Sequence, residues 1–138
     1  CALGPRACNE WGLRCVVSYG PGEEELAERV CASSGNAEPV LARRPLGELM
    51  ALLRDAEIVV GGDTGPLHLA VSLGTRVVAL YGPTDPMRNG PYRSDDIVLR
   101  NVDAHTDHTR GNAPDPSMLK ITVEAVADAM KRRLEARP

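Results

Sequence analysis

The residues best suited to chemistry lie in one short stretch, residues 61–68 (GGDTGPLH), between an apolar run and a segment with helical spacing. Asp63 or Thr64 can cap the start of such a helix by accepting hydrogen bonds from its first amides. Gly65 has no side chain, so a ligand can approach the backbone closely. Pro66 suits a first helical turn, where its missing N–H costs nothing. The amides that remain, together with the helix dipole, favour an anion such as a pyrophosphate.

His68 lies one helical turn after Thr64, so both side chains are expected on the same face at the start of the helix. An imidazole there can donate a hydrogen bond to a phosphate, and it does so more strongly when protonated. An Asp-Thr-Gly sequence is also an ordinary cap and turn, and a single His on a helix is often a buried, satisfied residue. The residues alone leave the two interpretations evenly balanced, and the position after a strand favours the binding site.

Three other groups of residues have a functional and a structural interpretation. One carboxylate of Glu23-Glu24-Glu25 could accept from the hydroxyls of a ribose, but composition favours a simple match to the helix dipole. Residues 82–86 (GPTDP) form a stiff polar loop that suits sugar hydroxyls and is equally a common turn. Arg43 and Arg44 could offer positive charge to an anionic ligand or flank a surface turn.

Alternation of strands and helices positions these residues. Short apolar runs predict strands, and longer segments with apolar residues three and four apart predict helices. The expected strands are residues 14–19, 40–41, 58–60, 77–80 and 97–99, and the expected helices are residues 23–31, 46–53, 67–73 and 121–134, after a first helix that ends near Trp11. We expect loops at residues 82–86, 89–94 and 100–116. This order predicts an α/β fold with a parallel sheet and helices on both faces, which binds ligands at the carboxyl ends of its strands.

Composition excludes several classes of protein. The formal net charge of −3 argues against a nucleic-acid-binding module, which usually has a basic face. No apolar run approaches the roughly 18 residues of a membrane span. The four cysteines have no C-x-x-C spacing, which favours free thiols in a reducing compartment over zinc ligands or disulfides. The sequence also lacks the glycine-rich motifs of nicotinamide and phosphate-loop enzymes and the Gly-x-Ser-x-Gly of hydrolases. We therefore expect no metal and no cofactor.

Two linked motifs, IVVGGDTGPLHLA at residues 58–70 and VVALYGPTDP at residues 77–86, resemble glycosyltransferase family 9. These enzymes are the ADP-heptose–lipopolysaccharide heptosyltransferases, and the heptosyltransferase I branch looks most similar. The resemblance covers most of residues 14–99 and includes the segment from Tyr19 to Glu25. It implies the C-terminal, donor-binding half of a GT-B fold, in which two Rossmann-like domains face each other. Residues 1–12 would then be the remnant of a preceding segment, and residues 13–138 the nucleotide-sugar-binding domain.

The resemblance also implies roles for individual residues. Thr64, Gly65 and His68 would contact the diphosphate or heptose of the donor, with Asp63 close by, and Glu24 would hold the ribose. Arg44 falls where the family has an adenine-contacting residue that is often apolar. In the family, a phosphate-binding Lys lies just before the part of the enzyme that this chain resembles. We find no Lys here to match it, since the first Lys of the sequence is Lys120.

Inverting transfer needs a base on the acceptor side, so we assign no catalytic residue within this chain. We expect a cytoplasmic heptosyltransferase, or one peripheral at the inner membrane, whose lipopolysaccharide core acceptor is bound by an absent N-terminal domain. Alone, the chain would bind its donor weakly and turn over little. The alternatives are another GT-B enzyme with a different nucleotide sugar, such as an epimerase, and a non-catalytic interaction domain that keeps the fold.

Overall fold

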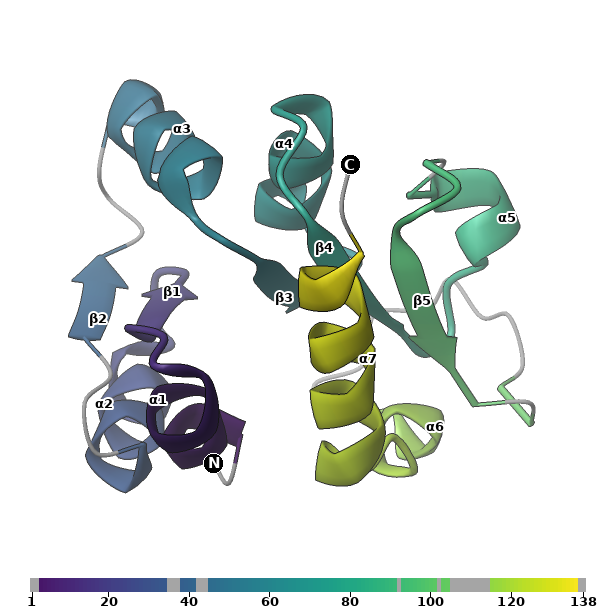
Figure 1. Cartoon of the computed structure of the whole chain (residues 1–138), viewed down its shortest axis with the longest axis horizontal. Coiled ribbons are helices and arrows are strands. Elements are labelled where there is room, and N and C mark those ends of the chain that lie inside the picture. The colour runs from purple at the N-terminus through teal and green to yellow at the C-terminus, as the bar shows by residue number, and fades with distance from the viewer. Residues whose placement is uncertain are drawn as a thin grey trace. The chain divides into compact units, whose positions relative to one another are not determined.

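The computed structural model describes residues 3–34, 38–41, 45–91, 93–101, 103–104 and 115–136, with only the backbone of residues 38–41. The chain divides into two compact units, Cys1–Gly47 and Glu48–Pro138. Each unit is described by itself, and Figure 1 gives the element labels used below.

The first unit is a short α/β segment. It contains α1 (Leu3–Trp11), β1 (Val16–Tyr19), α2 (Glu24–Ser33) and β2 (Glu38–Leu41), and the two strands pair in parallel. Helix α1 ends as predicted at Trp11, and Gly12 follows it with a φ of 65°, a conformation that glycine adopts without steric cost. Helix α2 packs against both strands, and its Ala27 is buried.

The second unit is built on a three-stranded parallel sheet in the order β3–β4–β5. Its elements are α3 (Leu46–Asp55, which starts at the unit boundary), β3 (Val59–Gly62), α4 (Gly65–Ser72), β4 (Val77–Tyr81), α5 (Pro86–Asn89), β5 (Ile97–Arg100), α6 (Pro116–Leu119) and α7 (Val123–Glu135). The predicted alternation of strands and helices and the parallel pairing are confirmed.

The central strand β4 shows that both faces of this sheet are covered. Its consecutive residues Val77, Val78 and Ala79 are all 0% exposed, and successive side chains of a strand point to opposite faces. Helix α4 packs against β3 and β4, and α7 packs against β4 and β5, crossing β4 in Figure 1. Leu67 of α4 joins the core cluster around β4.

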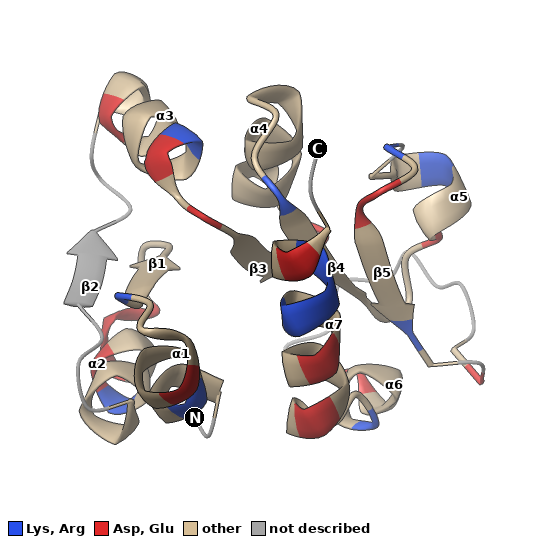
Figure 2. Cartoon of the chain, in the orientation of Figure 1, with Lys and Arg blue, Asp and Glu red and all other residues tan. Residues whose placement is uncertain are grey.

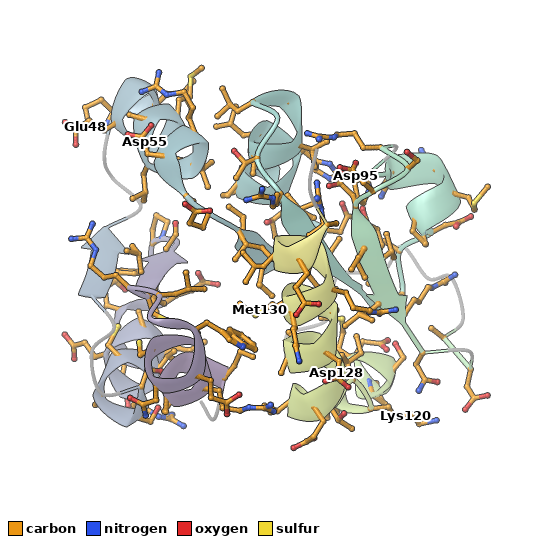
Figure 3. All side chains as sticks on the ribbon, viewed as in Figure 1. Glu48, Asp55, Asp95, Lys120, Asp128 and Met130 are labelled. Carbon is orange, nitrogen blue, oxygen red and sulfur yellow. The ribbon has the colours of Figure 1, made fainter. Side chains whose placement is uncertain are left out.

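Helix α7 is stabilised by a side-chain cap at its start and by the burial of its apolar face. The Thr122 hydroxyl accepts a hydrogen bond from the Ala125 amide at 3.2 Å and caps the first turn. Val126, Ala127 and Met130 are buried on one side, and Figure 3 labels Met130 on this helix. The predicted closing helix is therefore confirmed, although it begins at Val123 rather than at residue 121.

The expectation of loops at residues 82–86, 89–94 and 100–116 was wrong in part, because α5 and α6 each begin with an Asp-Pro pair there. The Asp85 carboxylate accepts from the Met87 amide at 2.9 Å, and the Asp115 carboxylate accepts from the Ser117 amide at 2.8 Å. Both helices thus start with an Asp cap and a proline in the first turn. Within the described ranges, no helix has the length and apolar character needed to cross a bilayer.

Candidate functional site

The candidate site lies where β3 and β4 end. Asp63 directly follows β3, whereas Thr84 and Asn89 belong to the segment that follows β4. These strands are parallel neighbours, with Gly62 paired with Leu80, so their carboxyl ends meet at the same edge of the sheet. This edge is where an open parallel sheet binds its ligands.

The start of α4 is the part of the site most open to an anion. Thr64 is the N-cap residue, with extended backbone angles (φ −140°, ψ 160°), and no side chain makes a capping hydrogen bond there. The expectation that Asp63 or Thr64 accepts from the first amides is wrong, since the Thr64 hydroxyl instead donates to the Gly62 carbonyl at 3.3 Å. A Cβ added to Gly65 would meet no atom within 4 Å. The first amides of α4 therefore face open space without a side-chain cap.

A hydrogen-bonded chain of side chains flanks this helix start. The Asp63 Oδ1 atom lies 2.7 Å from His68 Nε2, and Asp63 Oδ2 accepts from Asn89 Nδ2 at 2.7 Å. The Asp63 side chain is 16% exposed and that of His68 is 41% exposed. The carboxylate is thus largely enclosed, while the imidazole reaches solvent.

The charge state of Asp63 follows from these contacts. Burial by itself raises the pKa of the Asp63 carboxyl, because it disfavours the charged form. Hydrogen bonds from His68, Asn89 and the Thr84 side chain outweigh burial, so the pKa lies below its ordinary value. An ionised carboxylate only accepts hydrogen bonds, so the proton of the Asp63–His68 pair sits on His68 Nε2. An anion would therefore meet the other ring nitrogen, Nδ1.

Helix α4 has no Lys or Arg, so among its own side chains only the imidazole of His68 can become positively charged toward an anion. Figure 2 shows α4 without a single Lys, Arg, Asp or Glu along its length. Its apolar residues Leu67 and Ala70 are buried and fix the helix on the sheet. The site therefore offers amides at a helix start and one imidazole, which suit a phosphate group. The Thr64 hydroxyl can join them by turning away from the Gly62 carbonyl, to which it donates here.

The structure brings four of the six predicted site residues together. Asp63, Thr64, Gly65 and His68 lie together at the start of α4 in the second unit. Glu24 is the exposed first residue of α2 in the first unit, and Arg44 lies outside the described residues. The neighbouring Glu23 closes the preceding turn, since its Oε2 accepts from the Gly20 amide at 2.7 Å.

Sequence reasoning missed two contributors to the site. Thr84 stood in a polar loop considered for sugar hydroxyls but was not itself chosen as a site residue, and Asn89 carried no signal in the sequence. The strand order could have indicated Thr84, because neighbouring parallel strands bring their following loops together. Asn89 contacts Asp63 across 26 positions of sequence, a pairing that only the fold creates.

The described cysteines all belong to the first unit. Cys8, Cys15 and Cys31 are free thiols, and the Sγ atoms of Cys8 and Cys15 are 3.5 Å apart. Burial, and then the hydrogen bond and charge of Cys8, raise the pKa of the Cys15 thiol to about 11. In the part of the chain that the structure describes, no group of three or more His, Cys, Asp or Glu side chains could hold a metal ion.

The family model described as "Glycosyltransferase family 9 (heptosyltransferase)" matches residues 6–116. A curated relative, lipopolysaccharide heptosyltransferase 1 of Escherichia coli O18:K1:H7, is 31% identical over 125 residues, covering 90% of this chain and 34% of the relative. The protein of the same name from Pseudomonas aeruginosa is 35% identical over 99 residues, covering 70% of this chain and 27% of the relative. The chain thus spans about a third of the length of these relatives.

Solved structures show the same similarity. Escherichia coli ADP-heptose lipopolysaccharide heptosyltransferase II superposes with a TM-score of 0.82 at 22% identity, covering 96% of this chain and 39% of that one, which supports the fold. Escherichia coli heptosyltransferase WaaC, solved with ADP, has a TM-score of 0.77 at 27% identity and covers 96% of this chain and 37% of that one.

Proposed function

The chain belongs to glycosyltransferase family 9, and from that membership we propose that it is the donor-binding part of an inverting heptosyltransferase. Its donor would be ADP-heptose, and the acceptor of the whole enzyme would be the inner core of lipopolysaccharide. The similar WaaC structures contain ADP and an ADP-heptose analogue, which supports a nucleotide diphosphate as the ligand of the corresponding part of this chain.

The observation that carries the proposal is the start of α4. Its amides lack a side-chain cap, Gly65 leaves open space beside them, and His68 stands one turn further along. A diphosphate placed there would accept hydrogen bonds from backbone amides and from the imidazole, and from the Thr64 hydroxyl once it turns away from the Gly62 carbonyl. Since His68 Nε2 is turned toward Asp63, the ring would meet the ligand through Nδ1, which donates when the ring carries both protons.

In the chemical step, we propose that this chain stabilises the leaving group, ADP. Transfer of the heptose leaves negative charge on the β-phosphate of ADP, and oriented donors that meet this charge lower the barrier. Deprotonation of the attacking hydroxyl requires a base on the acceptor side. Because the chain spans about a third of its relatives, we place that base and the lipopolysaccharide acceptor site in the remainder of such an enzyme.

Two further residues are proposed, from the family resemblance, to contact the donor. Glu24 begins α2 with an exposed carboxylate, which suits the paired hydroxyls of a ribose. Arg44 is proposed, from the family resemblance alone, to contact the base. Both roles depend on the family resemblance, whereas the diphosphate site is also supported by local geometry.

Calorimetric titration of the chain with ADP tests the diphosphate site. We expect His68→Ala to weaken binding by about 10- to 150-fold, the value of a hydrogen bond to a charged group, and Thr64→Ala by about 2- to 10-fold. Ser72→Ala is the matched control, because its hydroxyl lies at the other end of the same helix and donates only to the Leu69 carbonyl. Equal affinity in the wild type and the two site variants would defeat the assignment.

The same titration separates the proposed donor from its alternatives. Tighter binding of ADP than of UDP or GDP is expected for an ADP-heptose enzyme, whereas a preference for UDP would indicate a different GT-B enzyme. Glu24→Gln should weaken ADP but not inorganic pyrophosphate, which has no ribose, with Glu28→Gln on the same helix as its control. No binding of any nucleotide would favour a non-catalytic domain.

A further inference from the structure

Asn89 connects the two loops of the diphosphate site. It is the last residue of α5, and its Nδ2 donates to Asp63 Oδ2 at 2.7 Å. The other carboxylate oxygen, Oδ1, is bound by His68 Nε2 at 2.7 Å. Each oxygen of Asp63 is therefore held from a different helix, α5 on one side and α4 on the other.

Asn89 is itself held in place by the end of β4. The Asp85 carboxylate caps α5, and the Asn89 amide donates to the Asp85 carbonyl at 3.0 Å. The wholly buried Tyr81 donates its hydroxyl hydrogen bond to the carbonyl of Gly90, the residue after Asn89. The side-chain amide thus reaches Asp63 from a short helix that is fixed at both ends.

This arrangement determines how the imidazole is presented. A carboxylate bound at one oxygen can rotate about its χ2 angle, whereas a carboxylate bound at both is fixed in its plane. The His68 ring then keeps Nε2 toward Asp63, and its solvent-exposed edge with Nδ1 remains for a ligand. The Thr84 side chain also bonds Asp63, and the other charged residues of the α5 segment are Asp85, engaged in its cap, and Arg88.

We propose that Asn89 is a positioning residue of the donor site, which orients His68 toward the donor diphosphate by holding Asp63. This role rests on the proposed function of the site. Asn89 contacts the ligand at no point in this scheme, so its effect passes entirely through the Asp63 carboxylate. That distinction separates it from a residue that binds the nucleotide and from one that only stabilises the fold.

A double-mutant cycle on the full chain tests the proposal. ADP affinity is measured by calorimetry for the wild type, Asn89→Ala, Asp63→Asn and the double variant. We expect Asn89→Ala to weaken ADP by about 3- to 10-fold, the value of one hydrogen bond, and to have almost no effect in the Asp63→Asn background. Losses that multiply independently would overturn the proposal, as would an Asn89→Ala variant that binds ADP like the wild type.

A second measurement needs no ligand. Titration of the Asp63 carboxyl by carbon NMR should show a higher pKa in Asn89→Ala, because a hydrogen bond to the charged form is lost. Asn101→Ala is the control, since among the described residues its side chain accepts from the Asp103 amide and makes no contact with Asp63. If Asn89→Ala does not fold, Asn89→Asp keeps the size of the side chain and should raise the same pKa further, through like charge.

The two measurements distinguish the two proposals. A wild type that binds no ADP would end the proposed function, and the NMR titration would still decide whether Asn89 controls Asp63. An Asp63 titration unchanged in both Asn89 variants would overturn the positioning role even if ADP binds.

Discussion

Replacing Arg133 by Met should strongly destabilise the second unit, because it removes the buried one of the two cations, Arg93 and Arg133, that act on a buried carboxylate. The Arg133 side chain is 3% exposed, and its Nη2 lies 2.7 Å from Asp95 Oδ2 and 3.6 Å from Asp96 Oδ1. The Asp96 side chain is 0% exposed, and neither of its oxygens has a hydrogen bond of ordinary geometry among the described residues. Figure 3 labels Asp95 in the turn before β5. The cluster therefore fastens α7 to the turn before β5.

The size of the effect follows from burial. Removing one partner of a buried ion pair costs about 3–5 kcal/mol, because the remaining charge is desolvated and unpaired. A chain of this length has a free energy of unfolding of about 7–20 kcal/mol, so the substitution removes a large share of it. Met matches the length of the arginine stem, which limits any contribution from a cavity.

The loss should also depend on pH. Burial raises the pKa of the Asp96 carboxyl, and the charges of Arg93 and Arg133 lower it in part. Without Arg133 this pKa rises further. A carboxyl whose pKa is higher in the folded than in the unfolded chain costs stability as pH rises through that range. The deficit of Arg133→Met should therefore be largest near neutral pH and shrink as the pH falls and Asp96 takes up a proton.

Urea unfolding at several pH values measures this deficit directly. Arg133→Met combined with Asp96→Leu is the informative control, because it removes both buried charges and should recover most of the lost stability. Arg132→Met, on the exposed side of the same helix, should change little. A deficit below about 1 kcal/mol, or one that does not change between pH 7 and pH 4, would refute the account of Asp96 as a buried charge held by Arg133.

Three further outcomes are expected. Leu67→Ala should cost about 2–5 kcal/mol in urea unfolding, because Leu67 is 1% exposed in the core under the site; a loss below 1 kcal/mol would contradict its place there. Because the pKa of Asp63 is lowered in the fold, its contribution to stability is present above about pH 4 and lost as the pH falls through the folded pKa; a stability difference between wild type and Asp63→Asn that persists at pH 2 would contradict this. Iodoacetamide should alkylate Cys15 more slowly than Cys31 at pH 7.5, since few Cys15 thiols are ionised below a pKa of about 11; mass spectrometry showing equal rates would contradict it.

The parts of the fold that sequence predicted are those with local causes. Apolar runs such as Val77–Tyr81 can only be buried as a strand between helices, and the alternation of such runs with helical segments leaves parallel pairing as the natural arrangement. Gly12 and Gly74, each with a positive φ, follow the ends of α1 and α4, where glycine is a common helix terminator. These features depend on residues a few positions apart.

The parts that sequence did not predict depend on contacts across the fold or on competing local bonds. The Asp-Pro pairs that begin α5 and α6 can be read from the sequence. Helices of four residues, however, are too short to show a periodic pattern of apolar residues. At the start of α4, the Thr64 hydroxyl could either cap the helix or donate to the carbonyl of the last residue of β3. In the structure it donates to that carbonyl, of Gly62. The contact of Asn89 with Asp63 exists only because β3 and β4 are neighbours.

The site proposed at the start of α4 would recognise what all nucleoside diphosphates share. Amides, a hydroxyl and an imidazole bind phosphate oxygens without regard to the base or the sugar. Asp63 and Asn89 only orient that imidazole, so changing them alters affinity for ADP, UDP and GDP by similar factors. Selection of the nucleotide must then come from residues that touch the ribose and base, for which Glu24 and Arg44 are the proposed candidates. On this proposal, donor affinity and donor choice would be carried by different residues of the chain, and they could change independently.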